Sequence, residues 1–172
     1  MRVTWTMTAG LLVVAVGAMR AATRLDRLEA RTDAAWAALD AALCRRAHTV
    51  NGLGMGAAAR CAADAALRTG TSAARAGAAD REKCENELGR MLALLDRNEL
   101  EPACVRRLVD AEQRVVIARR VYNDAVRDTL ALRSHRMVRW LRLAGTAPLP
   151  RYFEIAEPAL AGYEPELDGA GA

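Results

Sequence analysis

The segment that most constrains the fold runs from Val105 to Arg133, and it contains neither proline nor glycine. Its apolar and small residues recur at alternating spacings of three and four, which places them along one side of an α-helix. The stripe comprises Leu108, Ala111, Val115, Ala118, Tyr122, Ala125, Thr129 and Leu132. A helix with one apolar side needs other helices to cover that side. The stripe therefore predicts a helical bundle.

The composition favours the same fold class. The chain has 172 residues, which is long enough for one domain with its own core. Hydrophobic residues make up 52% of it, but many of these are alanine, and only 4% of the residues are aromatic. Alanine favours helices, whereas the β-branched and aromatic residues that favour strands are sparse. We therefore expect an all-α fold, a long antiparallel bundle of about four helices.

The charges and cysteines exclude some classes of function. The net charge is +4, but basic and acidic residues alternate, as in the segment 24–29, which is typical of solvated helix faces. No groove-reading motif accompanies the charge, so we expect no nucleic-acid partner. The cysteines form no Cys-x-x-Cys pair and resemble small apolar residues in a reducing compartment, although two disulfides remain an alternative outside the cell. They are Cys44, Cys61, Cys84 and Cys104.

An apolar run from Val3 to Met19 lies between Arg2 and Arg20. As a helix it is about 25 Å long, slightly short of a bilayer core. One interpretation is an uncleaved transmembrane anchor over residues 1–22, with Trp5 near the interface. A second is a signal peptide that is cleaved after Ala18, and a third is a buried helix. We prefer the anchor.

The basic residues predict the orientation of such an anchor. Arg2 precedes the run, whereas Arg20, Arg24, Arg27 and Arg31 follow it closely. Positive charge concentrates on the cytoplasmic side of membrane helices, so the soluble domain is expected in the cytoplasm. Unpaired cysteines agree with that side of the membrane.

The remaining helices follow from the same periodicity. Residues 21–51 carry a second stripe, which the glycine-rich segment 51–56 interrupts. A helix is expected over Ala57–Arg68 and a loop over Thr69–Ala79. The second stripe comprises Leu25, Leu28, Thr32, Trp36, Leu39, Leu43 and Val50.

A further helix is expected from Asp80, as its N-cap, to Asn98. The last helix begins at Pro102 and is expected to continue to Leu143, because Gly145 and two prolines follow. These boundaries assign residues 23–156 to the bundle. Residues 157–172 contain proline, glycine and acidic residues and are expected to form a mobile tail.

Four sequence pieces, in order, resemble the LemA family of bacterial membrane-anchored helical proteins. The best is Ala118–Val126, ARRVYNDAV, and the others are Ala35-Trp36 with the following segment to Arg46, Glu87–Leu94, and Tyr152-Phe153-Glu154. The resemblance covers residues 24–156. The chain departs from the family at Gly52–Met55, where a Pro-x-Leu-Val step is usual, and at Asp128–His135, where a Tyr-Asn-rich extension is usual.

This resemblance implies a long antiparallel bundle behind an N-terminal membrane helix, no established enzymatic activity and a role at the bacterial envelope. We therefore predict a non-enzymatic, single-pass scaffold or interaction protein of the bacterial cell membrane, with an unidentified protein partner. The alternative is an exported helical binding module that is released by signal-peptide cleavage. We expect no cofactor and no small-molecule substrate.

Few residues could carry chemistry. Cys44 and His48 are four residues apart and would share one helix face, but a zinc site needs further ligands, so we predict no metal. A Cys–His nucleophile also needs oxyanion donors, which no pattern supplies. The segment Gly52–Gly56 lacks the Lys-Ser/Thr of a phosphate-binding loop. We predict no catalytic residue.

Two surfaces are candidates for binding. A basic helical end containing Trp140 has the composition that contacts anionic membranes, although a solvated helix terminus has the same charges. Asn123 and Asp124 point away from the stripe and are candidates for contact with a partner or for capping a neighbouring segment. Tyr122 lies on the stripe, and its hydroxyl is expected to find a partner at the bundle edge. The basic surface comprises Arg133, Arg136, Arg139, Trp140 and Arg142, with His135 among them.

Overall fold

The computed structural model describes residues 2–54, 56–70, 78–140 and 148–156, with the backbone alone at residues 2–11, 13, 69, 70 and 137. Its regular structure over these ranges is helical, with no strand, so the all-α prediction is confirmed. The helices are α1 (Arg2–Gly52), α2 (Ala57–Gly70), α3 (Ala78–Ala93), a 3₁₀ helix (Arg97–Glu99), α4 (Pro102–Ser134) and α5 (Arg136–Trp140).

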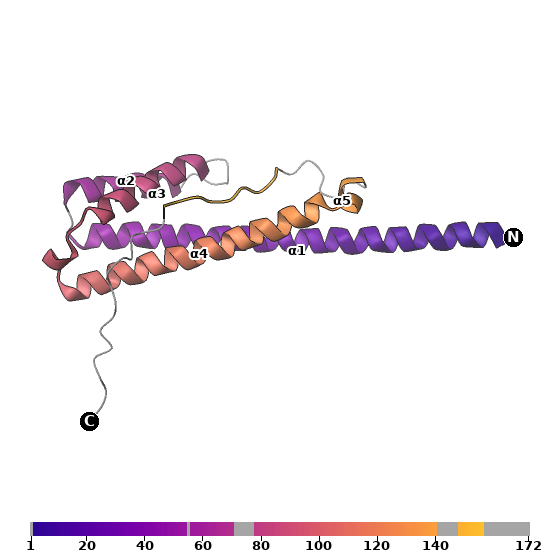
Figure 1. Cartoon of the computed structure of the whole chain (residues 1–172), viewed down its shortest axis with the longest axis horizontal. Coiled ribbons are helices and arrows are strands. Elements are labelled where there is room, and N and C mark those ends of the chain that lie inside the picture. Colours follow the sequence, from indigo (N-terminus) through magenta and orange to yellow (C-terminus); the bar gives the residue numbers. More distant parts are fainter. Residues whose placement is uncertain (1, 55, 71–77, 141–147, 157–172) are drawn as a thin grey trace, which may run out of the picture.

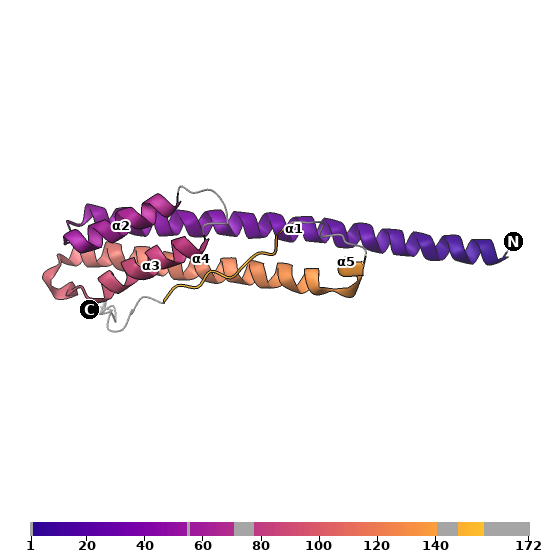
Figure 2. The same ribbon diagram turned by 90° about the horizontal axis from the view of Figure 1, so that it is seen from above.

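The molecule is long because α1 spans most of its length. Helix α4 runs antiparallel beside α1, and the α2–α3 hairpin packs over the end of α1 that lies away from the N-terminus (Figures 1 and 2). Helix α5 turns back against α1 near the end of α4. The result is an antiparallel bundle that is thickest at the α2–α3 end.

The predicted stripe of α4 forms the main contact with α1. Leu39 and Leu43 of α1 pack with Val115 and Val126 of α4 in one buried cluster. Farther along, the hydroxyls of Thr32 and Thr129 lie 3.0 Å apart between the two helices. Both stripes read from the sequence therefore face each other.

A second cluster forms where α1 meets the α2–α3 hairpin. Helix α2 contributes alanines to it, with Ala63 and Ala66 fully buried, and α3 contributes Leu88 and Leu92. Small side chains let helices approach closely, and this explains why an alanine-rich helix fits here.

Helix α1 is continuous from Arg2 to Gly52, so the expected boundary between anchor and bundle at residue 22 falls inside one helix. Among the side chains that the structure describes in α1, Leu25 is the first buried one. Over the residues that the structure describes, no helix is both long and apolar enough to cross a membrane. Much of the Val3–Met19 run lies outside the described side chains.

The end of α4 corrects one predicted boundary. The helix stops at Ser134 instead of Leu143, because His135 adopts an extended backbone with ψ 133° and its N–H returns to the carbonyl of Leu132. The short helix α5 follows after this break. Residues 141–147, which include Leu143 and Gly145, lie outside the described ranges.

The limits of α3 also differ from the prediction. The helix begins at Ala78, which places Asp80 in its first turn, where it pairs with exposed Lys83 at 3.6 Å. It ends at Ala93, and Asn98 instead lies in the 3₁₀ helix. Asp96 caps that helix by accepting a hydrogen bond from the Asn98 N–H, so a local side-chain cap decided the boundary.

Residues 148–156, here named the strap, pack on the helices in an extended conformation (Figure 1). It lies within residues 23–156, which were assigned to the bundle, and its Phe153 is fully buried. Its ring lies 5.7 Å from that of Trp36, at 73°. The strap thus belongs to the core, while the predicted mobile tail over residues 157–172 lies outside the described ranges.

Candidate membrane-facing surface

The N-terminal part of α1 projects beyond every other helix (Figures 1 and 2). Among its described side chains, Leu12 is 67% exposed and Met19 is 73% exposed, and Val14 and Val16 are also exposed. Single exposed apolar residues are ordinary, but several on a stretch that no other described helix covers form an exposed apolar surface. Arg20 and Arg24 follow it, and both are exposed. The apolar stretch up to Met19 is here named the apolar rod, and these two arginines are named its basic collar.

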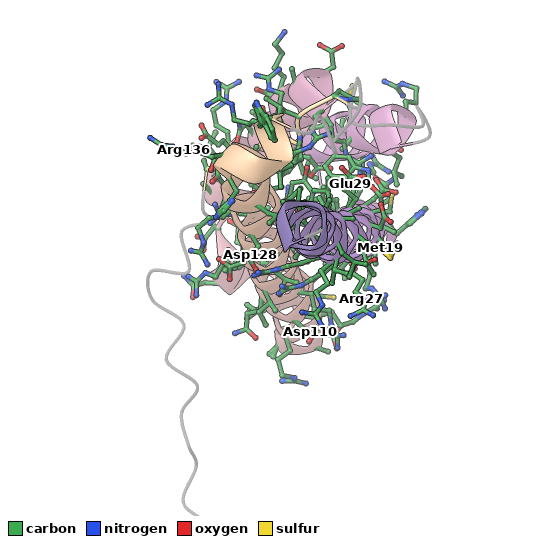
Figure 3. The ribbon with its side chains drawn as sticks, turned by 90° about the vertical axis from the view of Figure 1, so that its right-hand side faces the viewer. Met19, Arg27, Glu29, Asp110, Asp128 and Arg136 are labelled. Atoms are coloured by element: carbon green, nitrogen blue, oxygen red, sulfur yellow. The ribbon has the colours of Figure 1, made fainter. Side chains whose placement is uncertain are left out.

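Helix α5 presents a basic and aromatic group beside α1, at the end of the bundle that lies toward the N-terminus (Figure 2). Arg136, Arg139 and Trp140 are exposed, Trp140 by 82%, and together they line an open hollow. Val138 is buried and fixes α5 on the bundle. Seen end-on from the N-terminus, α5 lies beside α1 and Arg136 lies on its outer side (Figure 3). The end of the last helices therefore returns toward the N-terminal part of α1.

One predicted member of this surface lies in the interior instead. Arg133 is buried, since position 133 continues the inward-facing series of Val126 and Thr129. Its guanidinium donates a hydrogen bond to the carbonyl of Pro148 at 2.9 Å and lies 3.5 Å from the carboxylate of Glu29. Arg142 lies outside the described residues. The candidate surface on the described part of α5 thus consists of Arg136, Arg139 and Trp140.

The polar residues of the ARRVYNDAV segment have separate roles. The Tyr122 hydroxyl donates to the carbonyl of Arg151 at 2.9 Å, so its predicted partner is the strap. Asn123 also binds the strap, through the backbone of Phe153. Asp124 is exposed and pairs with Arg127 at 3.1 Å. Asn123 therefore caps a neighbouring segment, the second of its two predicted roles, and Asp124 remains a surface residue.

Cys44 and His48 do not form a site with other ligands. Cys44 is half-buried, and His48 is exposed. No cluster of three or more metal-binding side chains occurs in the described part of the chain. The Cys44 sulfur instead accepts a weak hydrogen bond from Arg81 Nη2 at 3.6 Å.

A buried charge cluster, which the sequence reading missed, lies beside Cys44. Glu85 Oε2 lies 2.6 Å from Arg46 Nη2, and its Oε1 lies 3.0 Å from Arg81 Nε. Arg81 also reaches Asp40 at 3.1 Å. The missed signal was the spacing of four between Arg81 and Glu85, in phase with Leu88 and Leu92. The charges balance within the cluster, and its function is to join α1 to α3.

A second buried carboxylate lies on α4. Glu112 is fully buried and pairs with Arg97 at 3.1 Å. Burial raises the pKa of Glu112, an effect that outweighs the opposing attraction of Arg97 and Arg46. The sequence signal here was a charge next to a stripe position, Ala111.

No family model, curated protein or solved structure that was compared with the chain matches it. The fold and this surface define an elongated all-helical bundle whose longest helix projects an apolar end with a basic collar. Membership of the LemA family remains a prediction that rests on the four sequence pieces quoted above.

Proposed function

We propose that this chain is a non-enzymatic, single-pass scaffold or interaction protein of the bacterial cell membrane, similar to the LemA family, with its bundle in the cytoplasm. The observation that carries the proposal is the uncovered apolar end of α1, which includes Leu12, Val14, Val16 and Met19. Exposing such a row to water is unfavourable, and insertion into lipid would cover it.

The continuity of α1 gives this anchor a mechanical role. A helix rises about 1.5 Å per residue, so the segment from residue 22 to Gly52 is about 45 Å long. An anchor and a bundle that share one helix cannot swivel about a loop. In this proposal the α2–α3 hairpin is held at a fixed distance from the bilayer, and the scaffold presents its helical faces there.

Helix α5 supplies a second contact with lipid in this proposal. Tryptophan is favoured at the membrane interface, and arginine is attracted to anionic head groups. Arg136, Arg139 and Trp140 are exposed at the end of the bundle that lies toward the apolar rod. Their position beside α1 would restrict the tilt of the bundle relative to the membrane.

Flotation with liposomes tests the anchor. The full chain is expected to float with vesicles and to remain there in high salt, whereas the double variant Leu12→Arg/Val16→Arg should stay in the aqueous fraction. The matched control is Leu94→Arg, because Leu94 is 77% exposed but lies after α3, remote from the N-terminus. A wild-type chain that remains in the aqueous fraction would contradict the anchor.

The mass of the chain recovered from bacterial membranes separates the two leading interpretations. A chain that retains Met1 and the following run supports a permanent anchor. A chain that begins after Ala18 would instead support the exported binding module.

A further inference from the structure

The strap is held through its main chain. Hydrogen bonds between described residues join it to α3 and α4, and six of them use a backbone N–H or C=O of the strap. Three strap carbonyls accept hydrogen bonds from α4: Pro148 from Arg133, Arg151 from Tyr122, and Phe153 from Asn123. Three strap amides donate: Phe153 to Asn123, Glu154 to Glu82, and Ala156 to Asn86. Contacts of this kind would accept any extended peptide with a backbone in the same position.

Asn123 acts as a clamp on one strap residue. Its Nδ2 donates to the carbonyl of Phe153 at 3.2 Å, and its Oδ1 accepts from the N–H of Phe153 at 2.9 Å. The side-chain amide thus makes the pair of hydrogen bonds that a neighbouring β-strand residue would make. Such a clamp recognises an extended backbone and leaves the strap side chain free to vary.

The strap side chains supply the selectivity. Phe153 and Ile155 are buried against α1 and α4. Tyr152, which precedes Phe153, and Glu154, which lies between the two buried residues, are exposed. This alternation follows the period of two of an extended chain. The helices therefore select an aromatic residue and, two positions later, an aliphatic one.

The groove is not completely filled. Near the start of the strap, a recess of about 70 Å³ lies between Pro148, Pro150 and the helix residues Glu29, Thr32 and Arg133. A peptide with larger side chains than these prolines would have room there. The groove walls are helix residues, and the cluster that joins α1 to α2 and α3 contains no strap residue.

We propose that the groove occupied by the strap is a binding site for an extended segment of a different protein that carries an aromatic-x-aliphatic sequence, and that the strap is its resident occupant. This inference goes beyond the membrane-scaffold proposal, because it concerns the face of α4 that the strap covers and needs no anchor. A strap in the same chain acts at a high effective concentration, so an incoming peptide must compete with it. Binding is therefore weak until the strap is released.

A labelled peptide with the sequence of residues 148–156 serves as the probe, and its fluorescence anisotropy is measured against the full chain in detergent micelles. The strap variant Phe153→Ala/Ile155→Ala loosens the resident occupant without altering the groove walls. It should bind the peptide at least about tenfold more tightly than the wild type. Equal affinities, or no binding by a folded strap variant, would overturn the proposal.

Two further substitutions, made in the strap variant, test the clamp. Removing Asn123 as Asn123→Ala deletes two hydrogen bonds and should weaken peptide binding by about tenfold. Asp124→Ala is the matched control, because Asp124 is the next residue of α4 but is exposed and contacts Arg127 instead of the strap. Equal losses from the two substitutions would contradict backbone recognition by Asn123.

Hydrogen exchange of the wild-type chain keeps the proposal testable if the strap variant fails to fold. Saturating peptide should speed exchange at the amides of Phe153, Glu154 and Ala156, which lose their partners when the strap leaves. Unchanged exchange at these amides would contradict displacement. Sedimentation gives the remaining outcome: a wild-type dimer that dissociates in the strap variant would assign the groove to a second copy and overturn the proposed partner.

Discussion

At the scale of single residues, the interior of this bundle is unusual for its charges. Arg46, Arg81, Glu85, Glu112 and Arg133 are all buried, although many of the other charges lie on exposed faces. Burying a charge is unfavourable unless a partner of opposite sign is close. Glu85 meets that requirement for two arginines from two helices at once.

This arrangement predicts that Glu85→Gln is strongly destabilising. The substitution leaves Arg46 and Arg81 without their shared carboxylate, and Arg46 Nε and Arg81 Nη1 already have no hydrogen-bond partner among the described residues. The free energy of unfolding should fall by about 3–5 kcal/mol. Urea unfolding provides the measurement. The control Glu87→Gln, at an exposed pair with Arg90, should change stability by less than about 1 kcal/mol. Similar losses in both variants would contradict the cluster's role.

Glu112 predicts a pH dependence of stability. Its folded pKa lies above the reference value of 4.5, so between these two values the folded chain binds more protons than the unfolded chain. The stability that Glu112 contributes therefore falls as pH rises through that window and stays constant above it. In Glu112→Gln this term is absent. The difference in unfolding free energy, wild type minus variant, should decrease from about pH 4 upward and then level off. A difference that increases with pH would show that the pairing with Arg97 outweighs burial.

At the scale of elements, the periodic stripes correctly predicted that the long helices form. Local hydrogen bonds and backbone conformation decided where each helix begins and ends. Apolar spacing correctly indicated the long helices α1 and α4, and alanine content indicated α2. It could not locate the break at His135, because the residues after it continue the same apolar and basic pattern. The strap was also missed, since an extended segment that packs on helices has no long periodic signal.

The turn between α1 and α2 predicts opposite effects at two neighbouring glycines. Gly54 has a φ of 66°, in the left-handed region that side chains disfavour, so Gly54→Ala should destabilise the chain by about 1 kcal/mol. Gly52 is the last residue of α1, and a Cβ built there meets nothing within 4 Å. Gly52→Ala should therefore be neutral or should stabilise by up to about 1 kcal/mol. Thermal unfolding of the two variants checks both signs.

At the scale of the whole molecule, the shape links the apolar end of α1 to the basic face of α5. One continuous helix, α1, runs from that apolar end to the α2–α3 hairpin (Figure 1). The strap lies along the middle of the bundle. In the proposed arrangement the membrane-facing end and the peptide groove are separate surfaces. They can be altered independently.

Contact between α5 and lipid is expected to depend on charge. In liposomes containing brominated anionic lipids, the fluorescence of Trp140, identified by comparison with Trp140→Phe, should be quenched. Arg136→Glu/Arg139→Glu and high salt should both reduce this quenching, because they weaken attraction to the head groups. The control Arg106→Glu/Arg107→Glu makes the same change in charge at the exposed opposite end of α4. If neither high salt nor the α5 substitutions change the quenching of Trp140, this contact is excluded.

The sequence by itself determined the fold class, the two apolar stripes and the absence of any recognisable catalytic pattern, because helix period and composition are local properties. Only the tertiary structure decided which charged residues are buried, where α4 ends and what Asn123 and Tyr122 bind. Each of these depends on side chains that are far apart in the sequence, such as Arg46 with Glu85, or Asn123 with Phe153. Arg133 illustrates the difference: its charge indicated a surface residue, but its position opposite Glu29 and the strap made it part of the interior.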